Sequence, residues 1–337
     1  MVEREKVCVT GAGGYLGSWV VKFLLSKGYI VHGTVRDPED DKNTHLKKLE
    51  HAEENLKLFK ADLLDYDGLC IAIAGCSGVF HIACPVPLPS LISALNYKIN
   101  LIEPSVKGTL NVLDASVKAK VNKVVYASSI GAVVVNPNLS KGQVMDENCW
   151  SDIEFCKSIE VCYIKCKLQQ WYCVAKTLAE QEAWEYAKRS ELKILTVCPS
   201  IIIGPRLQPT MNSSSLYLLR ILKDGSESAE NRHRALVDVR DTAESLLMLY
   251  EKPEAEGRYI CSSHEIREQD LVEKLKNMYP YYNYPKSFSE GEGVSLNSEK
   301  LQNLGWKYRP LEDTLVDAVK DYEESGALAK VELAQTS

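Results

Sequence analysis

Short apolar runs alternate with amphipathic stretches through the first 199 residues of the chain. The runs have the length of strands buried on both faces of a parallel sheet, and the stretches between them show helical periodicity. Strands are predicted at 7–9, 30–35, 56–61, 78–82, 123–127 and 192–198. Helices are predicted at 16–26, 43–54, 97–120 and 171–189. This alternation indicates βαβ units and therefore an α/β fold with a doubly wound parallel sheet.

The pattern is less regular in three places. A proline cluster through Pro89 interrupts regular structure, and residues 143–170 are predicted to form a polar loop with a short helix. Beyond residue 199 the alternation loosens, and the tyrosine- and proline-rich stretch 279–286 is predicted to be a loop. The later helices are predicted at 216–223, 239–251, 268–278 and 312–325.

A glycine-rich turn separates the first predicted strand from the first predicted helix. Glycine takes positive φ freely and allows a ligand to approach the backbone, and the helix that follows offers unpaired N–H groups and a partial positive charge. Strand, glycine-rich turn and helix in this order are the fingerprint of a site for a dinucleotide pyrophosphate. The residues expected to contact the dinucleotide here are Gly11, Gly13, Gly14, Tyr15, Leu16 and Gly17.

The ends of the later strands supply further cofactor contacts. Arg36 follows the second strand, where an arginine accommodates the 2′-phosphate of NADP and an acid would bind the 2′-hydroxyl of NAD. We therefore expect NADP(H), with Lys42 as a second cation; the alternative is a solvated Arg36 with Asp37 on the ribose. The remaining strand-end residues expected at the cofactor are Asp62, Leu63, Ala83, Pro199 and Ser200.

Tyr172 and Lys176 are four positions apart on a predicted helix, so their side chains share one face. A tyrosine hydroxyl titrates near 10, and a lysine ammonium beside it favours the phenolate and lowers that pKa. Lys176 can also donate to the nicotinamide ribose. Tyr172 can then protonate a carbonyl oxygen that Ser129, at the end of the fifth strand, stabilises by a hydrogen bond. The spacing of Tyr172 and Lys176 alone is weak evidence for a catalytic pair. The evidence becomes stronger because the pair follows the glycine-rich turn and Ser129 along the chain.

These residues resemble the extended short-chain dehydrogenase/reductase family, and in particular its plant branch of cinnamoyl-CoA reductases, cinnamyl alcohol dehydrogenases and dihydroflavonol reductases. The motifs that carry the resemblance to the branch are Thr34–Pro38, Phe80–Ala83, Asp146–Asp152, Trp171–Cys173 and Gly204–Thr210. The resemblance covers the chain to about Gly326. It implies a Rossmann-type, NADPH-dependent reductase with Ser129, Tyr172 and Lys176 as its catalytic triad.

The change of pattern after residue 199 predicts how the chain is divided. Residues 1–199 are expected to form the NADP-binding Rossmann domain, with 236–260 returning to it. Residues 200–326 are expected to form mainly a smaller carboxyl-terminal lobe that binds the substrate at the carboxyl ends of the strands. Residues 327–337 have little to anchor them and are expected to be a flexible tail.

Departures from the branch favour one substrate class. Cinnamoyl-CoA reductases carry a histidine and a lysine for the CoA ester where this chain has Tyr217 and Arg220, although Arg267 matches a further arginine. We therefore expect reversible reduction of hydroxycinnamaldehydes such as coniferaldehyde to alcohols. The alternatives are reduction of a CoA thioester, reduction of a flavonoid-type ketone, and a dinucleotide-sensing scaffold without chemistry. The residues expected at the substrate are Ser129, Tyr172, Gln208, Met211, Tyr217 and Arg220.

Composition narrows the possible partners, the cellular location and the role of the cysteines. The chain of 337 residues is 45% hydrophobic and 26% charged with a net charge of −6, which argues against a nucleic-acid partner. No apolar stretch is long enough to span a membrane and no targeting signal precedes the first strand, so we expect a cytoplasmic protein. The 11 cysteines show no metal-site spacing, and those between Cys149 and Cys173 raise a redox switch as a hypothesis. A small-molecule partner is expected, and both monomer and dimer stay open.

Overall fold

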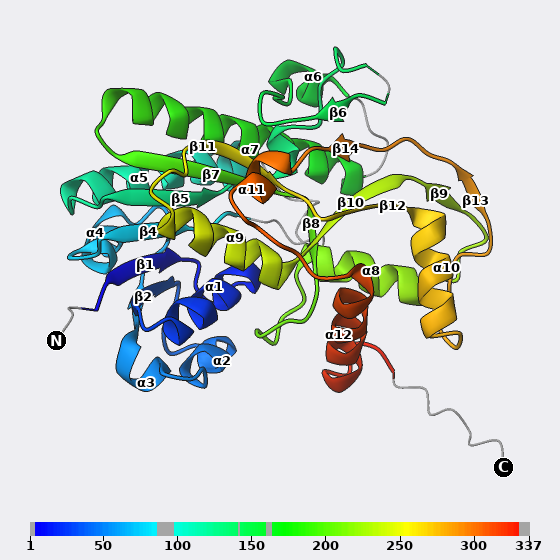
Figure 1. The fold of residues 1–337 in the computed structure, drawn as a ribbon, viewed down its shortest axis with the longest axis horizontal. Coiled ribbons are helices and arrows are strands. Elements are labelled where there is room, and N and C mark those ends of the chain that lie inside the picture. Colours follow the sequence, from blue (N-terminus) through cyan, green and yellow to red (C-terminus); the bar gives the residue numbers. More distant parts are fainter. Residues whose placement is uncertain (1–3, 86–97, 141, 160–163, 330–337) are drawn as a thin grey trace.

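The computed structural model describes residues 4–85, 98–140, 142–159 and 164–329. Within these residues, seven strands form one parallel sheet with helices on both faces (Figure 1). Their order across the sheet is β11 (Gly257–Cys261), β7 (Lys193–Pro199), β5 (Lys123–Ala127), β4 (Gly78–His81), β1 (Lys6–Thr10), β2 (Ile30–Val35) and β3 (Leu56–Lys60). The predicted α/β fold with a doubly wound parallel sheet is confirmed.

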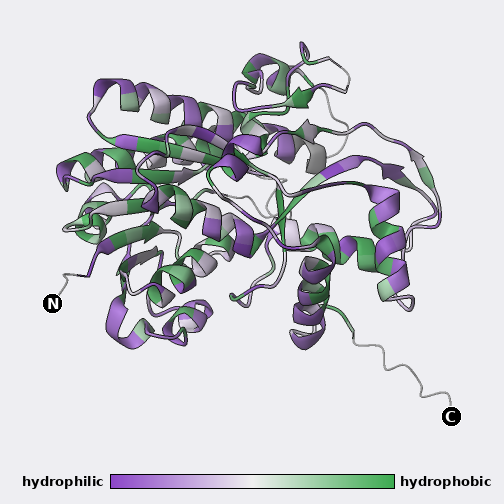
Figure 2. Cartoon of the chain, in the orientation of Figure 1, coloured by the Kyte–Doolittle hydropathy of each residue, from purple (hydrophilic) through white to green (hydrophobic). Residues whose placement is uncertain are grey.

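The two faces of the sheet bury different sets of side chains. On one face, α1 (Tyr15–Ser26) and α9 (Val239–Glu251) pack against each other, and Val9 of β1 lies in their apolar cluster. On the other, α4 (Tyr66–Ile73), α5 (Glu103–Lys118) and α7 (Ile164–Arg189) surround a cluster that contains the next residue along β1, Cys8. Successive strand residues point to opposite faces, so a run that is apolar throughout is required here. Figure 2 shows hydrophobic residues both on strands of the sheet and on the helices that cover it.

Several predicted boundaries are wrong. The helix predicted at 43–54 is broken into a 3₁₀ turn (Asp41–Asn43), α2 (Thr44–Lys47) and α3 (Ala52–Asn55), because His51 adopts a left-handed backbone with φ of 63°. A helix that we did not predict, α4, begins where the Asp65 carboxylate accepts a capping hydrogen bond from the Gly68 N–H at 3.0 Å.

The region 143–170 contains more structure than predicted. It holds β6 (Val144–Met145), α6 (Ile153–Ser158) and the start of α7, which begins at Ile164 and not at Trp171. The π-helical turn at Lys98–Ile102 leads into α5. The proline cluster through Pro89, the first residue of the helix predicted at 97–120, and most of the tail lie outside the described residues.

A second, smaller group of elements lies beside the sheet (Figure 1). Its helices are α8 (Ser213–Lys223), α10 (Glu268–Met278) and α12 (Leu311–Glu324), whereas α11 (Glu299–Asn303) packs against β11 of the large sheet. Its strands are β8 (Ile201–Ile203), β10 (His233–Asp238) and β12 (His264–Arg267) in one sheet, and the pairs β9 (Ala229–Asn231) with β13 (Phe288–Glu290) and β14 (Ser295–Leu296) with β6. Apolar side chains of α8, α10 and α12 share one buried cluster. The helices were predicted except α11, and the short strands were not.

The chain crosses between the two groups more than once. After β10, residues 239–261 supply α9 and β11 to the large sheet, and β12 then returns to the three-stranded sheet. The three strands of that sheet lie in the order β12, β10, β8. No helix in the described part of the chain is long and apolar enough to cross a membrane.

Candidate active site

The glycine-rich turn connects the end of β1 to α1 in a conformation that side chains would block. Gly11 has φ of +69°, and a Cβ there would lie 3.0 Å from Cα of Ala83. A Cβ on Gly13 would lie 2.3 Å from Oδ1 of Asn43. Gly14 is the N-cap residue and has no side chain to accept a capping bond, so the first N–H groups of α1 stay open to an anion. The turn therefore fits a pyrophosphate, in line with the prediction for this loop.

The turn lies between β1 and β4, where the strand order of the sheet reverses. Ligands bind at this switch point in open α/β sheets. Thr10 fixes the two strand ends together, because its Oγ1 accepts hydrogen bonds from the Ile82 and Ala83 N–H groups at 3.0 and 3.1 Å. Its own proton is then donated to Nδ1 of His81 at 2.9 Å, which leaves Nε2–H of His81 to donate to Thr109 Oγ1 at 3.1 Å. Burial lowers the pKa of His81 to about 3, so this link is uncharged.

Ser129, Tyr172 and Lys176 meet at the carboxyl end of β5. Lys176 is 3% exposed and its Nζ donates to the Ala127 carbonyl at 2.9 Å. Ser129 Oγ accepts from the Gly131 N–H at 3.0 Å. A Cβ built on Gly131 would lie 3.4 Å from that Oγ and 3.5 Å from Cε1 of Tyr172, so the serine and the tyrosine border the same small space. The structure thus brings together the three residues predicted to be catalytic.

The electrostatics of this cluster suit a proton donor. The pKa of Tyr172 is raised above its ordinary value, mainly because the hydroxyl is buried. The Lys176 charge and a hydrogen bond with Ser129 act in the opposite direction and offset only part of this rise. The pKa of Lys176 is also raised: burial lowers it, and neighbouring Cys84, Tyr126 and Tyr172 more than offset this. The phenol is therefore protonated and the ammonium charged at neutral pH, and Tyr172 can release a proton to an oxygen that gains negative charge.

The predicted adenosine contacts lie on the other side of the turn. Arg36 is exposed at the end of β2, and the Asp37 carbonyl accepts from Nδ2 of Asn43 at 2.8 Å. Asn43 thereby fixes the Arg36 segment beside the glycine-rich turn, a role that the sequence did not reveal. Lys42 pairs with Asp40 and its ammonium is half-exposed. Asp62 is exposed, and its Oδ1 accepts from the Leu64 N–H at 3.0 Å.

Other predicted cofactor residues are largely built into the scaffold. The Tyr15 hydroxyl donates to the Gly204 carbonyl at 2.9 Å, and Leu16 lies in the core, so only their backbone N–H groups can face a phosphate. The Leu63 side chain packs against Gly108 of α5. Pro199 ends β7, and the next residue, Ser200, donates its N–H to the Cys261 carbonyl at 3.0 Å.

Three of the predicted site residues carry buried polar atoms that have no hydrogen-bond partner among the described residues. These atoms are Ser200 Oγ, Gln208 Oε1 and the Tyr217 hydroxyl. The Arg234 guanidinium, which pairs with Glu268 at 2.7 Å, lies 5.4 Å from the centre of the Tyr217 ring. Arg220 is exposed and Met211 half-buried. Unpartnered buried polar atoms are costly unless a ligand completes them, so Ser200 is a candidate cofactor contact and Gln208 and Tyr217 are candidate substrate contacts. The same kind of atom also occurs outside the predicted site, in Ser262 and Tyr322.

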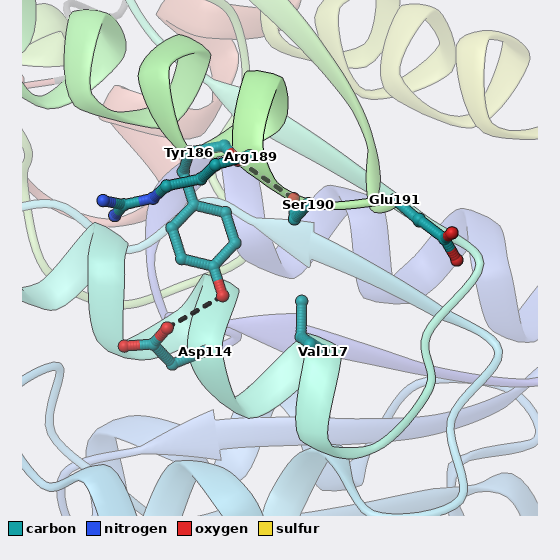
Figure 3. Close-up of a pocket in the computed structure, with 6 residues that line it drawn as sticks. All are labelled: Asp114, Val117, Tyr186, Arg189, Ser190 and Glu191. Carbon is teal, nitrogen blue, oxygen red and sulfur yellow. Dashed lines mark hydrogen bonds between the residues drawn. The ribbon is translucent and has the colours of Figure 1, made fainter.

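A hollow of about 460 Å³ lies at the far end of α7 (Figure 3). Its walls come from α5, the last turns of α7 and the residues that follow, and its lining is Asp114, Val117, Tyr186, Arg189, Ser190 and Glu191. The Tyr186 hydroxyl donates to Asp114 Oδ1 at 2.8 Å and the Arg189 guanidinium lies over the ring. Helices α5 and α7 end at this hollow, shortly before β5 and β7 begin. The hollow therefore lies at the amino edge of the sheet, away from the catalytic cluster.

Comparison with known proteins identifies the family to which the chain belongs. The sequence pattern of the NAD dependent epimerase/dehydratase family matches residues 7–261. The chain belongs to this family. Cinnamoyl-CoA reductase 2 of Arabidopsis thaliana is 41% identical over 333 residues, which cover 97% of this chain and 95% of the relative. A bifunctional dihydroflavonol 4-reductase/flavanone 4-reductase of Malus domestica is 42% identical over 335 residues, or 97% and 92% of the two chains.

A solved structure supports the same placement within the epimerase/dehydratase family. Vestitone reductase from alfalfa superimposes with a TM-score of 0.78 and 30% identity, over 96% of this chain and all of that chain. The predicted resemblance to the extended short-chain reductases, and to the plant branch that holds cinnamoyl-CoA and dihydroflavonol reductases, is therefore confirmed. The protein is an oxidoreductase of this branch.

Proposed function

We propose that the protein is an NADPH-dependent reductase of hydroxycinnamaldehydes, which it converts reversibly to the alcohols. The observation that carries the proposal is the convergence of Ser129, Tyr172 and Lys176 at the end of β5, one strand away from the β1–β4 switch point. A bound nicotinamide supplies the hydride for the carbonyl carbon. A protein that only sensed a dinucleotide would not need the three side chains together.

The chain's own residues handle the proton and the developing charge. As the carbonyl oxygen becomes negative, Ser129 donates a hydrogen bond to it and Tyr172 transfers its phenolic proton. The buried Lys176 ammonium stabilises the phenolate that is left and can hold the ribose hydroxyls of the dinucleotide. Because Lys176 is fixed by the Ala127 carbonyl, this charge stays one helical turn from Tyr172 throughout the step.

One feature favours the free aldehyde over a CoA thioester. Tyr217 stands where the branch's CoA reductases carry a histidine, and its ring supports Arg234, so this part of the wall is aromatic and partly closed. Arg220 is exposed, and as a cation it can also meet the phosphates of a CoA ester, so it does not separate the two candidates. The second candidate is the CoA thioester, which the names of relatives at 41% to 43% identity favour.

The two candidates are separated by following NADPH consumption with coniferaldehyde and feruloyl-CoA under the same conditions. We expect the aldehyde to be the better substrate by kcat/KM. A larger kcat/KM for feruloyl-CoA would assign the thioester reaction and remove the argument from Tyr217. If neither compound oxidises NADPH while the protein still binds it, the proposed substrate class is wrong.

Cofactor preference provides a separate test at the end of β2. Arg36→Asp is expected to lower kcat/KM for NADPH by about 10- to 100-fold, because a charge-assisted bond to the 2′-phosphate contributes about 1.5–3 kcal/mol. The activity with NADH is expected to change little or to rise. Arg189→Ala removes an equally exposed arginine at the other edge of the sheet and serves as control. Unchanged discrimination between NADPH and NADH in Arg36→Asp would show that Asp37 or another residue sets the preference.

A further inference from the structure

Three successive turns of α7 contact three consecutive residues at the end of β5. The pairs are Tyr172 with Ser129, Lys176 with Ala127, and Glu180 with Ser128. The first two pairs belong to the proposed chemistry. The third has no part in it, although Glu180 Oε2 accepts a hydrogen bond from Ser128 Oγ at 2.6 Å, which is shorter than the 2.9 Å bond from Lys176 Nζ to the Ala127 carbonyl.

Glu180 is a fully buried carboxylate whose charge is balanced by one arginine. Arg258 of β11, 6% exposed, donates from Nε to Oε1 at 2.7 Å and from its terminal nitrogen to Oε2 at 3.2 Å. Thr196 of β7 donates to Oε1 at 2.9 Å. Bidentate geometry and further hydrogen bonds are what a buried ion pair requires, since each ion alone would lose its hydration.

Arg258 also reaches the backbone on the far side of Ser129. It donates to the Ala132 carbonyl at 3.1 Å, in the 3₁₀ turn Ile130–Ala132 that Ser129 caps. It donates to the carbonyls of Glu147 and Cys149, and its guanidinium lies 3.7 Å from the centre of the Trp150 ring. One arginine therefore connects β11 and α7 with the 3₁₀ turn that follows Ser129 and with the loop that carries Glu147 and Cys149.

We propose that Glu180 and Arg258 are positioning residues that hold Ser129 opposite Tyr172. The proposal rests on the proposed reductase function, and neither residue touches the reacting atoms. The Ser129 hydroxyl is hydrogen-bonded to the Gly131 N–H and to Tyr172, and the backbone of 127–132 decides where it lies relative to Tyr172. That backbone is tied to α7 on one side through Ser128 and to β11 on the other through Ala132. A shift of about 1 Å in a catalytic group can lower a rate by about 100-fold.

A matched pair of mild variants tests the link to Ser129. Ser128→Ala and Thr196→Val each remove one hydrogen bond to the Glu180 carboxylate, and only Ser128 is adjacent to Ser129. Ser128→Ala is expected to lower kcat by about tenfold with the KM for NADPH unchanged. Thr196→Val is expected to lose comparable thermal stability and to keep kcat within about twofold. Equal effects of the two variants on kcat would overturn the proposal in favour of a purely structural ion pair.

A double-mutant cycle tests the positioning role directly. Glu180→Gln keeps the shape of the side chain and removes its charge, and it is expected to lower kcat at least about tenfold. In a Ser129→Ala background the same change is expected to alter kcat by less than about twofold, because residues that act through one group are not additive. The same factor in both backgrounds would contradict the proposal. If Glu180→Gln does not fold, the cycle is run with Ser128→Ala.

The outcomes separate the two proposals. A wild-type protein that reduces none of coniferaldehyde, feruloyl-CoA and a flavonoid-type ketone overturns the reductase function and the positioning role with it. A wild-type protein that is active and a Glu180→Gln protein that is folded and equally active overturn the positioning role alone.

Discussion

Tyr172→Phe is expected to lower kcat for carbonyl reduction by about 10²- to 10⁴-fold, the usual contribution of a positioned general acid. The phenol is the group beside Ser129 whose proton can reach a carbonyl oxygen, and burial keeps it protonated at neutral pH. Phenylalanine retains the ring and therefore the packing around Gly131. Steady-state kinetics should show a loss in kcat, and the dissociation constant of NADPH, followed by its fluorescence, should be unchanged.

Tyr186→Phe is the matched control for this experiment. It removes a tyrosine hydroxyl from the same helix, at the hollow of Figure 3, where the hydroxyl donates to Asp114. The free energy of unfolding is expected to fall by about 1 kcal/mol because one hydrogen bond is lost, and kcat is expected to be unchanged. A Tyr172→Phe protein with wild-type kcat would exclude the proposed proton transfer.

Gly17→Ala is expected to weaken dinucleotide binding at least tenfold, that is, by about 1.4 kcal/mol or more. A Cβ at this position would lie 2.2 Å from the Gly11 carbonyl oxygen and 3.0 Å from its carbon. Both atoms belong to the backbone of the turn, so the turn must open and its N–H groups must leave the positions that suit a pyrophosphate. Overpacking of this kind also destabilises a fold by about 1–3 kcal/mol. Titration with NADPH and thermal unfolding measure the two effects.

Gly28→Ala provides the comparison at the other end of α1. Gly28 has φ of +85°, and no described atom lies within 4 Å of the Cβ that alanine would add. The substitution strains the backbone by about 1–2 kcal/mol and leaves the glycine-rich turn alone. We expect lower stability with unchanged NADPH affinity. If Gly17→Ala also binds NADPH normally, the turn is not the pyrophosphate site.

The fold was predictable wherever the sequence pattern of a single strand or helix was enough to identify that element. Val7–Val9 of β1 form an apolar run because both faces of this central strand are covered, and this pattern needs no knowledge of partners. The edge strand β3 mixes lysines with apolar residues and is only partly buried. The short strands after Pro199 carry no such signal, because they are stabilised by neighbours that lie far away in the sequence. The break at His51 was missed since a residue with positive φ is not marked by any turn-forming composition there.

The candidate site was predictable to the extent that its residues follow strand ends or share a helix face. Tyr172 and Lys176 are of this kind, and so is Glu180, whose place one turn further along α7 was a signal that the sequence offered. Its partner Arg258 lies 78 residues away and its significance depends on β11 joining the sheet. Asn43 was predicted to be the first residue of a helix, whereas the structure uses its side chain beside Gly13.

The late arrival of β11 in the large sheet has a consequence for how the protein is made. During synthesis Glu180 is complete before Arg258 exists, and the edge of β7 stays unpaired until the chain has passed through residues 200–256. Pairing strands across so long a stretch is slow, because loop closure must precede the contacts that reward it. A nascent or truncated chain that ends before β11 therefore carries an uncompensated buried acid and an open strand edge, the combination that chaperones bind and that promotes aggregation.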